Sequence, residues 1–164
     1  MGLFSFLKNS GAKILTKKNA KTVAANPEVK RMEEEILNKQ KEILLKGIVD
    51  GMGKKVKNME LDYDGSTATI HGQVATQSDR EKIILALGNV SGVAQVDDRL
   101  SVKKKEPEAE FYTVKRGDTL GKIAKRYYGD PMKYKIIFEA NKPMLKDPNL
   151  IYSGQVLRIP PAKK

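Results

Sequence analysis

The chain has 164 residues with no cysteine and one histidine, and 31 basic against 20 acidic residues give it a formal net charge of +11 at pH 7. Without cysteine it can hold neither a disulfide nor a thiolate metal site, and a single histidine argues against zinc. The lysines are dispersed and are not interleaved with aromatic residues, so we expect no nucleic-acid partner. Aromatic residues make up 6% of the chain, and two small domains with aliphatic cores fit this length and composition.

The N-terminal sequence carries no recognisable export or anchoring signal. The apolar run from Leu3 to Leu7 is too short for the core of a signal peptide, and no positive start precedes it. Phe6 stands where a myristoylation motif has serine or threonine. No window is long and apolar enough for a transmembrane helix. We therefore expect a cytoplasmic protein.

Residues 1–25 are predicted to form an N-terminal arm, which consists of an amphipathic segment interrupted by Gly11 and a polar connector from Lys17 to Ala25. The apolar residues of the segment are Leu3, Phe4, Phe6, Leu7, Ala12, Ile14 and Leu15. They need a partner, which is either the first domain or a membrane surface with the lysines facing the headgroups. Composition leaves both alternatives open.

A long helix is predicted from Pro27 to about Lys46, closed by Gly47. Asn26 fits its N-cap, Pro27 its first turn and Glu28 an early acid that favours the helix dipole. The apolar residues fall mostly on one face, so we expect the helix to dock along its length. These residues are Val29, Met32, Ile36, Leu37, Ile43 and Leu44.

Two strands, a helix and a third strand follow. Residues 56–63 and 67–74 have strand composition and flank a turn at Asp64-Gly65-Ser66. Ser78-Asp79-Arg80-Glu81 matches a capping box before an apolar helix that ends at Leu87. Residues 93–102 then alternate as a strand does. The order is helix, strand, strand, helix, strand.

The turn Gly88-Asn89-Val90-Ser91-Gly92 stands at the C-terminus of that helix. The last carbonyl groups of a helix lack intrahelical partners, and the macrodipole makes this end negative. Gly88 and Gly92 can adopt positive φ, which would turn further carbonyls inward, as in backbone sites that coordinate cations. A bare cation and a Schellman-type cap are the two candidate solutions.

Residues 104–110 form a charged linker, and a second unit begins at Phe111. We expect a strand at 111–115, a helix at 120–128 capped near Asp118 and ended by Gly129, a second helix capped by Asp130-Pro131, and a strand at 155–159. This unit is predicted to be a small βααβ fold.

Phe111-Tyr112-Thr113-Val114-Lys115-Arg116-Gly117-Asp118-Thr119-Leu120, Asn141 and Ile151-Tyr152-Ser153-Gly154-Gln155 resemble a LysM domain. Gly72, the turn from Gly88 to Val93 and Val96-Asp97-Asp98 are similar to a BON domain. With the start Met-Gly-Leu-Phe-Ser-Phe-Leu-Lys, the chain resembles the bacterial cytoplasmic potassium-binding proteins over residues 1 to about 13 and 56–160. It departs from their pattern between Thr16 and Lys55, where it is longer and more basic.

The resemblance implies an α+β protein with an arm (1–25) packing on a BON domain (26–103, αββαβ), a linker (104–110) and a LysM domain (111–161, βααβ). It further implies a monomer that binds K⁺ through backbone carbonyls, becomes compact and acts as a sensor or buffer. Carried over by position, the ligand oxygens are those of Leu7, Ser10, Ala12, Gly88, Val90 and Val93. A neutral carbonyl cage suits a weakly hydrated monovalent ion better than calcium or magnesium.

Three alternatives remain. LysM domains bind N-acetylglucosamine polymers such as peptidoglycan, which here would involve Gly117, Asp118, Thr119, Leu120, Asn149, Leu150 and Ile151. The same domain could instead dock on the BON domain or receive a protein partner. Membrane-surface association through the BON domain and the arm is the third. We expect no enzyme, because adjacent strand residues such as Asp97 and Asp98 point to opposite faces and cannot act as an acid–base pair.

Overall fold

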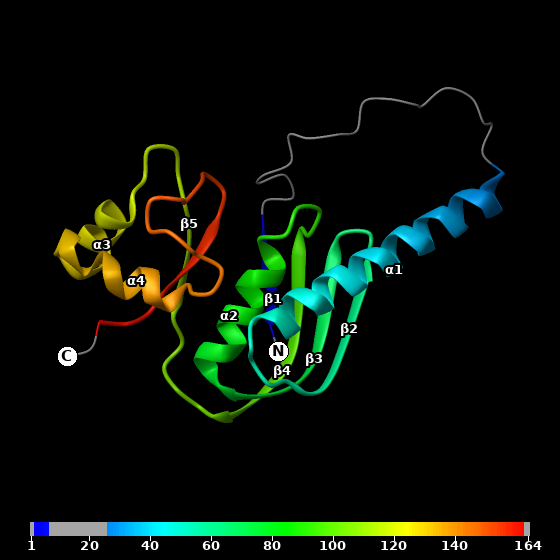
Figure 1. Ribbon diagram of the computed structural model, residues 1–164, viewed down its shortest axis with the longest axis horizontal. Coiled ribbons are helices and arrows are strands. Elements are labelled where there is room, and N and C mark those ends of the chain that lie inside the picture. Colours follow the sequence, from blue (N-terminus) through cyan, green and yellow to red (C-terminus); the bar gives the residue numbers. More distant parts are fainter. Residues whose placement is uncertain (1, 7–25, 163–164) are drawn as a thin grey trace.

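The computed structural model describes residues 2–6 and 26–162, which form two α+β domains (Figure 1). The first domain contains β1 (Gly2–Ser5), α1 (Pro27–Gly51), β2 (Lys57–Asp64), β3 (Thr67–Thr76), α2 (Gln77–Gly88) and β4 (Gln95–Lys104). The second contains β5 (Glu110–Thr113), α3 (Leu120–Tyr128), the 3₁₀ helix η1 (Pro131–Lys133), α4 (Tyr134–Ala140) and β6 (Val156–Ile159). The expected α+β class is confirmed.

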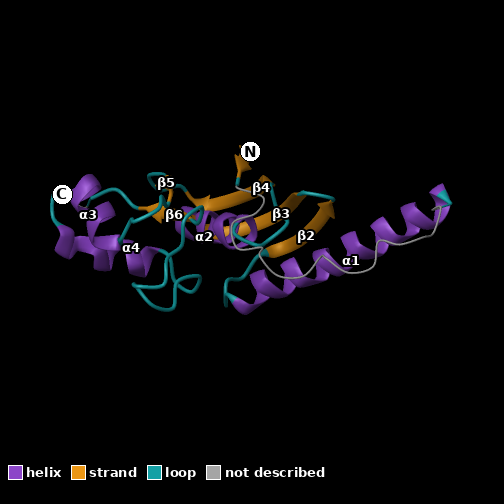
Figure 2. Ribbon diagram, turned by 90° about the horizontal axis from the view of Figure 1, so that it is seen from above, coloured by secondary structure: helices purple, strands orange, loops and turns teal. Residues whose placement is uncertain are grey.

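The first domain is a four-stranded sheet in the order β1-β4-β3-β2, with α1 and α2 packed on one face (Figure 2). Strands β2 and β3 form the predicted antiparallel hairpin, and α2 is the crossover between the parallel strands β3 and β4. One strand was not predicted. Residues Gly2–Ser5 form β1, which pairs antiparallel with the outer edge of β4.

Strand β1 accounts for where the first apolar residues of the arm pack. Side chains alternate along a strand, so Phe4 packs against the core while Leu3 is exposed. Phe4 also lies 5.3 Å, centroid to centroid, from the ring of Phe111 in the second domain. Of the arm, residues 2–6 thus lie along the sheet edge, and its predicted segment from Leu7 to Ala25 lies outside the described residues.

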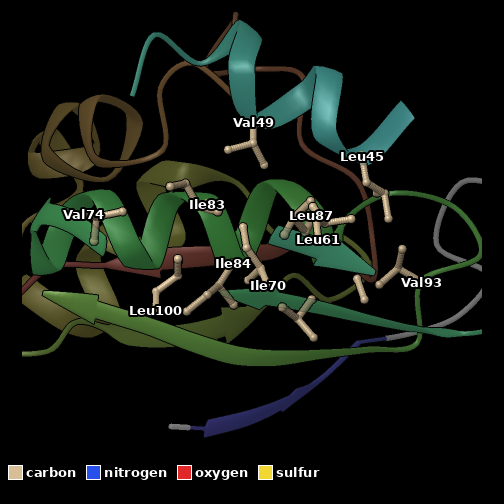
Figure 3. Close-up of a cluster of buried hydrophobic side chains, with 12 residues drawn as sticks. Leu45, Val49, Leu61, Ile70, Val74, Ile83, Ile84, Leu87, Val93 and Leu100 are labelled. Carbon is tan, nitrogen blue, oxygen red and sulfur yellow. The ribbon is translucent and has the colours of Figure 1, made fainter. Parts of the chain in front are cut away.

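The core of the first domain lies between the sheet and the two helices (Figure 3). Its buried members are Leu45, Val49, Leu61, Ala68, Ile70, Val74, Ile83, Ile84, Leu87, Val93, Val96 and Leu100. Helix α2 contributes buried side chains to this core along much of its length, whereas α1 contributes two fully buried side chains near its C-terminal end. The core therefore fixes α2 and only the last turns of α1.

Helix α1 differs from the prediction in its end and in its docked face. It is capped as expected, since the Asn26 side chain accepts a hydrogen bond from the Glu28 amide, but it continues through Gly47 to Gly51. The residues that dock are Leu45 and Val49, and the predicted docking face is solvent-exposed. That exposed face carries Val29, Met32, Ile36, Leu37, Ile43 and Leu44. The helix has 25 residues, which span about 37 Å, and it extends past the β2–β3 hairpin (Figure 1).

Two helix caps are also corrected. The N-cap of helix α2 lies two residues before the predicted one: Thr76, not Ser78, takes this position, and its hydroxyl accepts from the Asp79 amide at 3.1 Å. In α3 the N-cap is Thr119 rather than Asp118. In both cases a threonine in extended backbone takes the role because its side chain reaches the amide three residues ahead.

The second domain packs α3 and α4 against the two-stranded antiparallel sheet of β5 and β6. Gly129 ends α3 with φ of 73°, the left-handed cap that the sequence predicts. Asp130 accepts from the Met132 amide, so Asp130-Pro131 opens the 3₁₀ turn that leads into α4. Tyr112, Leu120, Ile123, Ile137, Leu157 and Ile159 are among the buried residues of this second core.

Candidate functional site

The turn between α2 and β4 closes with its own hydrogen bonds. The amide of Asn89 donates to the Leu85 carbonyl at 3.0 Å, Val90 donates to Leu87 at 3.1 Å, and Val93 donates to Val90 at 3.1 Å. Asn89 follows the helix with φ of −83°, so α2 does not end in the left-handed cap that a Schellman motif requires. Gly92 has φ of 92°, as expected, whereas Gly88 keeps helical backbone.

Gly88 provides space rather than positive φ. A Cβ atom at this position would lie 2.1 Å from Cζ of Phe6, because the Phe6 ring rests directly on the backbone of Gly88. The Phe6 amide also donates to the Ala94 carbonyl at 2.7 Å. The described part of the arm therefore ends in contact with both sides of the turn.

The carbonyl groups of the turn are not all used in the same way. Ser91 accepts from the ammonium of Lys41 in α1, and Val90 accepts from the Val93 amide. Within the described part of the chain, the carbonyls of Gly88 and Val93 accept no hydrogen bond. Each carbonyl oxygen has two lone pairs, so Gly88, Val90 and Val93 retain capacity for a further ligand.

Tyr63 of β2 contacts the last residue of the turn, Gly92. Its hydroxyl lies 2.9 Å from the carbonyl oxygens of both Gly92 and Gly65, and it can donate to one of them at a time. Burial raises the pKa of this phenol, which keeps it a donor. Lys41 thus links the turn to α1, and Tyr63 links it to the β2–β3 hairpin.

The electrostatics of this end of α2 favour a cation. The helix dipole is negative here, and the last turn of α2 contains no basic residue. Among the described residues there is no cluster of three or more histidine, aspartate or glutamate side chains that could hold a metal ion. A cation at the turn would therefore be bound by uncharged backbone oxygens.

Asn89 connects the turn to the second domain. Its side-chain amide donates to the Val156 carbonyl at 2.9 Å and accepts from the Val156 amide at 2.8 Å. It also donates to the Leu85 carbonyl one turn back in α2. Asn89 stands between Gly88 and Val90, two of the predicted ligands, so the same turn supplies the candidate carbonyls and the contact to β6.

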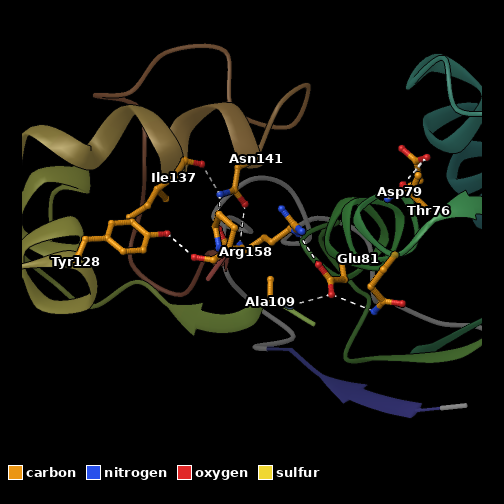
Figure 4. A network of polar contacts seen from close by, with 10 residues as sticks. Thr76, Asp79, Glu81, Ala109, Tyr128, Ile137, Asn141 and Arg158 are labelled. Atoms are coloured by element: carbon orange, nitrogen blue, oxygen red, sulfur yellow. Dashed lines mark hydrogen bonds and ion pairs between the residues drawn. The ribbon is translucent and has the colours of Figure 1, made fainter. Parts of the chain in front are cut away.

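Asn141 makes the matching contact from within the second domain. It donates to the Arg158 carbonyl and accepts from the Arg158 amide, both at 2.8 Å (Figure 4). Leu157 pairs with Tyr112 of β5 on the other edge. The outer edge of β6 is therefore occupied by two asparagines, Asn89 from the first domain and Asn141 from the second.

A buried ion pair also crosses the domain boundary (Figure 4). The Arg158 guanidinium contacts the Glu81 carboxylate of α2, and both side chains are buried. Glu81 also accepts from the amide of Ala109 at 2.9 Å and from the side chain of Gln77 at 3.0 Å. The sequence places Glu81 in a capping box, whereas the structure uses it to hold the linker and β6.

The second domain has a groove of about 330 Å³ between α3, α4 and the loop before β6. It brings together five predicted carbohydrate-binding residues, namely Asp118, Thr119, Leu120, Asn149 and Ile151. Gly117 and Leu150 do not line it, and Gly121, Tyr134 and Pro148 line it without having been predicted. Hydrogen bonds from the Tyr112 hydroxyl and the Lys115 amide lower the pKa of Asp118.

Both domains and the full chain match known proteins. A BON domain model matches residues 37–104, and a LysM domain model matches residues 112–160. Over 163 residues, covering 98% of this chain and 99% of the relative, the chain is 42% identical to the potassium binding protein Kbp of Escherichia coli O6:H1 (strain CFT073). The chain belongs to the Kbp family.

Other relatives match less of their own length than Kbp does. An uncharacterized protein of Deinococcus radiodurans is 36% identical over 124 residues, which are 68% of this chain and 48% of that protein. The endolysin of Bacillus phage B103 is 28% identical over 116 residues, which are 71% of this chain and 41% of that protein. The match with Kbp includes the BON domain, the LysM domain and the turn.

The predicted potassium ligands divide between described and undescribed parts of the chain. Gly88, Val90 and Val93 share one turn, while Leu7, Ser10 and Ala12 lie outside the described residues. No local pattern marks Asn89 or Tyr63 as residues that connect this turn to other elements, because Asn89 contacts Val156 and Tyr63 contacts Gly92, both far along the chain. No helix within the described ranges is long and apolar enough to cross a membrane.

We predict that Gly88→Ala destabilises the protein by about 1–3 kcal/mol, because the added methyl group overlaps the Phe6 ring and forces it off the turn. Gly47→Ala in α1 is the control: nothing lies within 4 Å of its Cβ position, and alanine should stabilise the helix by up to about 1 kcal/mol. Denaturant unfolding followed by circular dichroism measures both. Equal stability of G88A and wild type would contradict the packing of Phe6 on this turn.

Proposed function

We propose that this protein binds K⁺ in the cytoplasm through backbone carbonyls of the turn and the arm, and that it acts as a potassium sensor or buffer rather than as an enzyme. The observation that carries this proposal is the position of Phe6. Its ring covers Gly88 and its amide bonds to Ala94, so the arm meets the turn where the predicted ligands of both would have to join. The relative Kbp, named as a potassium binding protein, supports the choice of ion.

Potassium fits the chemistry of the turn. Calcium and magnesium sites draw on carboxylates, and the turn offers neutral carbonyl oxygens at the negative end of a helix. K⁺ gives up its water for such oxygens, as in rings of backbone carbonyls. The proposed ligands are the carbonyls of Gly88, Val90 and Val93 together with those of Leu7, Ser10 and Ala12.

Ion binding is proposed to order the two domains as well as the arm. An ion held by Gly88 and Val90 fixes the backbone on either side of Asn89, whose side chain holds Val156 of β6. A ligand that binds only one arrangement stabilises it by mass action. The ion-bound protein is therefore expected to be more compact, with the LysM domain docked on the BON domain.

The test is a calorimetric titration of the ion-stripped protein with KCl, with NaCl and CaCl₂ as controls at matched ionic strength, followed by X-ray scattering of both states. We expect saturable binding of K⁺, weak binding of Na⁺ and Ca²⁺, and a smaller radius of gyration with K⁺. Removal of residues 1–13 and Gly88→Pro should each abolish binding. Unchanged affinity in both variants would refute the proposed site.

Asn89→Ala tests the proposed link between the ion and the LysM domain. The variant loses four hydrogen bonds of its side chain, to the Leu85 carbonyl, the Met144 sulfur and both backbone groups of Val156. We expect about a tenfold loss of K⁺ affinity and a K⁺-bound radius of gyration close to that of the ion-free protein. Asn149→Ala, at an exposed residue of the second domain, is the control and should match wild type in both measurements. Compaction of N89A equal to wild type would remove Asn89 from the mechanism.

A second function, glycan binding, is favoured by the groove in the LysM domain. Tyr134 is an aromatic residue of its lining, and Asp118, Thr119 and Asn149 are polar residues of the same lining. Titration with N-acetylglucosamine oligomers, followed by NMR, should shift the amide signals of this groove. Tyr134→Ala should abolish the shifts and leave K⁺ binding unchanged. Absence of shifts in the wild-type protein would exclude this function.

A further inference from the structure

Lys41 is the charged side chain that α1 brings to the turn. Leu45, one helical turn further on, is fully buried in the core cluster together with Val93 (Figure 3). The backbone of α1 is therefore fixed beside the turn at this point. From there the Lys41 ammonium donates to the Ser91 carbonyl, across 50 residues of sequence.

The positive charge of Lys41 has no anionic partner in the described chain. None of the ion pairs found there includes Lys41, and its surroundings lower its pKa through burial alone. Its Nζ atom would lie 3.5 Å from a Cβ atom at Gly92, so the charge is close against the turn backbone. The turn thus already solvates one monovalent cation with a carbonyl oxygen, as it would a potassium ion.

We propose that Lys41 sets the K⁺ affinity of the turn by acting as a tethered competing cation; this inference rests on the proposed function. Ser91 directly follows Val90, a proposed ligand, so the ammonium and the ion share one stretch of backbone. Two unit positive charges a few ångströms apart repel each other, and with the screening of bulk water, which reaches this open surface, the repulsion corresponds to about a 3- to 10-fold change in affinity. The K⁺ affinity of the site is therefore lower than its carbonyl oxygens alone would give.

The structure also gives the ammonium a place to move to when the ion binds. Beside the turn lies an open groove of about 490 Å³ between α1 and the β2–β3 hairpin, and Lys41 lines it. The groove is also lined by the carboxylate residues Glu34 and Asp64. An ammonium displaced from Ser91 swings into this groove, toward negative charge and water.

Lys41→Met tests the proposal, because methionine keeps the apolar stem and removes the charge. By calorimetry at constant ionic strength we expect K⁺ to bind K41M about 3- to 10-fold more tightly than wild type. Lys41→Arg keeps the charge and should remain within twofold of wild type. Lys46→Met, at an exposed position of the same helix, makes the same change in net charge away from the turn and should also match wild type.

Lys41→Gln is the second neutral variant, and it retains a hydrogen-bond donor for the Ser91 carbonyl. Tighter K⁺ binding by both K41M and K41Q supports competition by charge. Affinity that is unchanged or weaker in both, while wild type binds K⁺, means that Lys41 organises the turn or is irrelevant to it, and this overturns the inference. Failure of wild type to bind K⁺ refutes the proposed function instead, so the two failures are distinguishable.

Discussion

The last carbonyl oxygens of helix α2 lack partners within the helix, and the amides of Asn89 and Val90 pair those of Leu85 and Leu87 as the chain turns. Four further groups hold this turn in place. They are the side chain of Asn89, the ammonium of Lys41, the hydroxyl of Tyr63 and the amide of Phe6. Each contact fixes one element against the turn, so the arm, α1 and the β2–β3 hairpin are all positioned by the end of one helix.

The second domain depends on the same turn for its orientation. An exposed strand edge pairs readily with other chains, and here the outer edge of β6 is covered by Asn89 and Asn141. The Glu81–Arg158 pair lies beside this edge. A buried ion pair adds little net stability because both charges lose their water, but it disfavours every docking geometry that leaves one charge alone. The pair therefore fixes the orientation of the domains, while the apolar contact of Phe4 with Phe111 contributes burial.

Local patterns predicted the elements that depend on near neighbours. The Asn26 cap, the Gly129 cap, the β2–β3 hairpin and the crossover helix are each encoded within a few residues. Strand β1 was missed because its partner β4 is about ninety residues away in the sequence. The docked face of α1 was misassigned because the helix carries apolar residues on two sides, and hydrophobic periodicity alone cannot say which side meets a core.

In the candidate site, too, local sequence patterns predict some features, and contacts with distant residues determine the others. A glycine-rich turn after an apolar helix is visible in the sequence, and so is the resemblance that assigns carbonyls within it. The roles of Gly88, Asn89 and Lys41 were not visible, because each depends on a side chain or backbone group from another element: the Phe6 ring, the edge of β6 and the Ser91 carbonyl. Side chains whose partners lie in another domain leave no local pattern to read.

In the proposed mechanism, ion binding and domain docking are thermodynamically linked because both involve this turn. If the proposed ion orders Gly88 and Val90, and Asn89 between them holds β6, then ion binding and domain docking are coupled through one short backbone segment. Such coupling is reciprocal: whatever the ion contributes to docking, docking contributes equally to ion affinity. A ligand or partner that breaks the contact between Asn89 and β6 must then weaken K⁺ binding by the same factor. In the proposed mechanism the LysM domain reports the potassium concentration, and a partner that competes for its docked face detects the change.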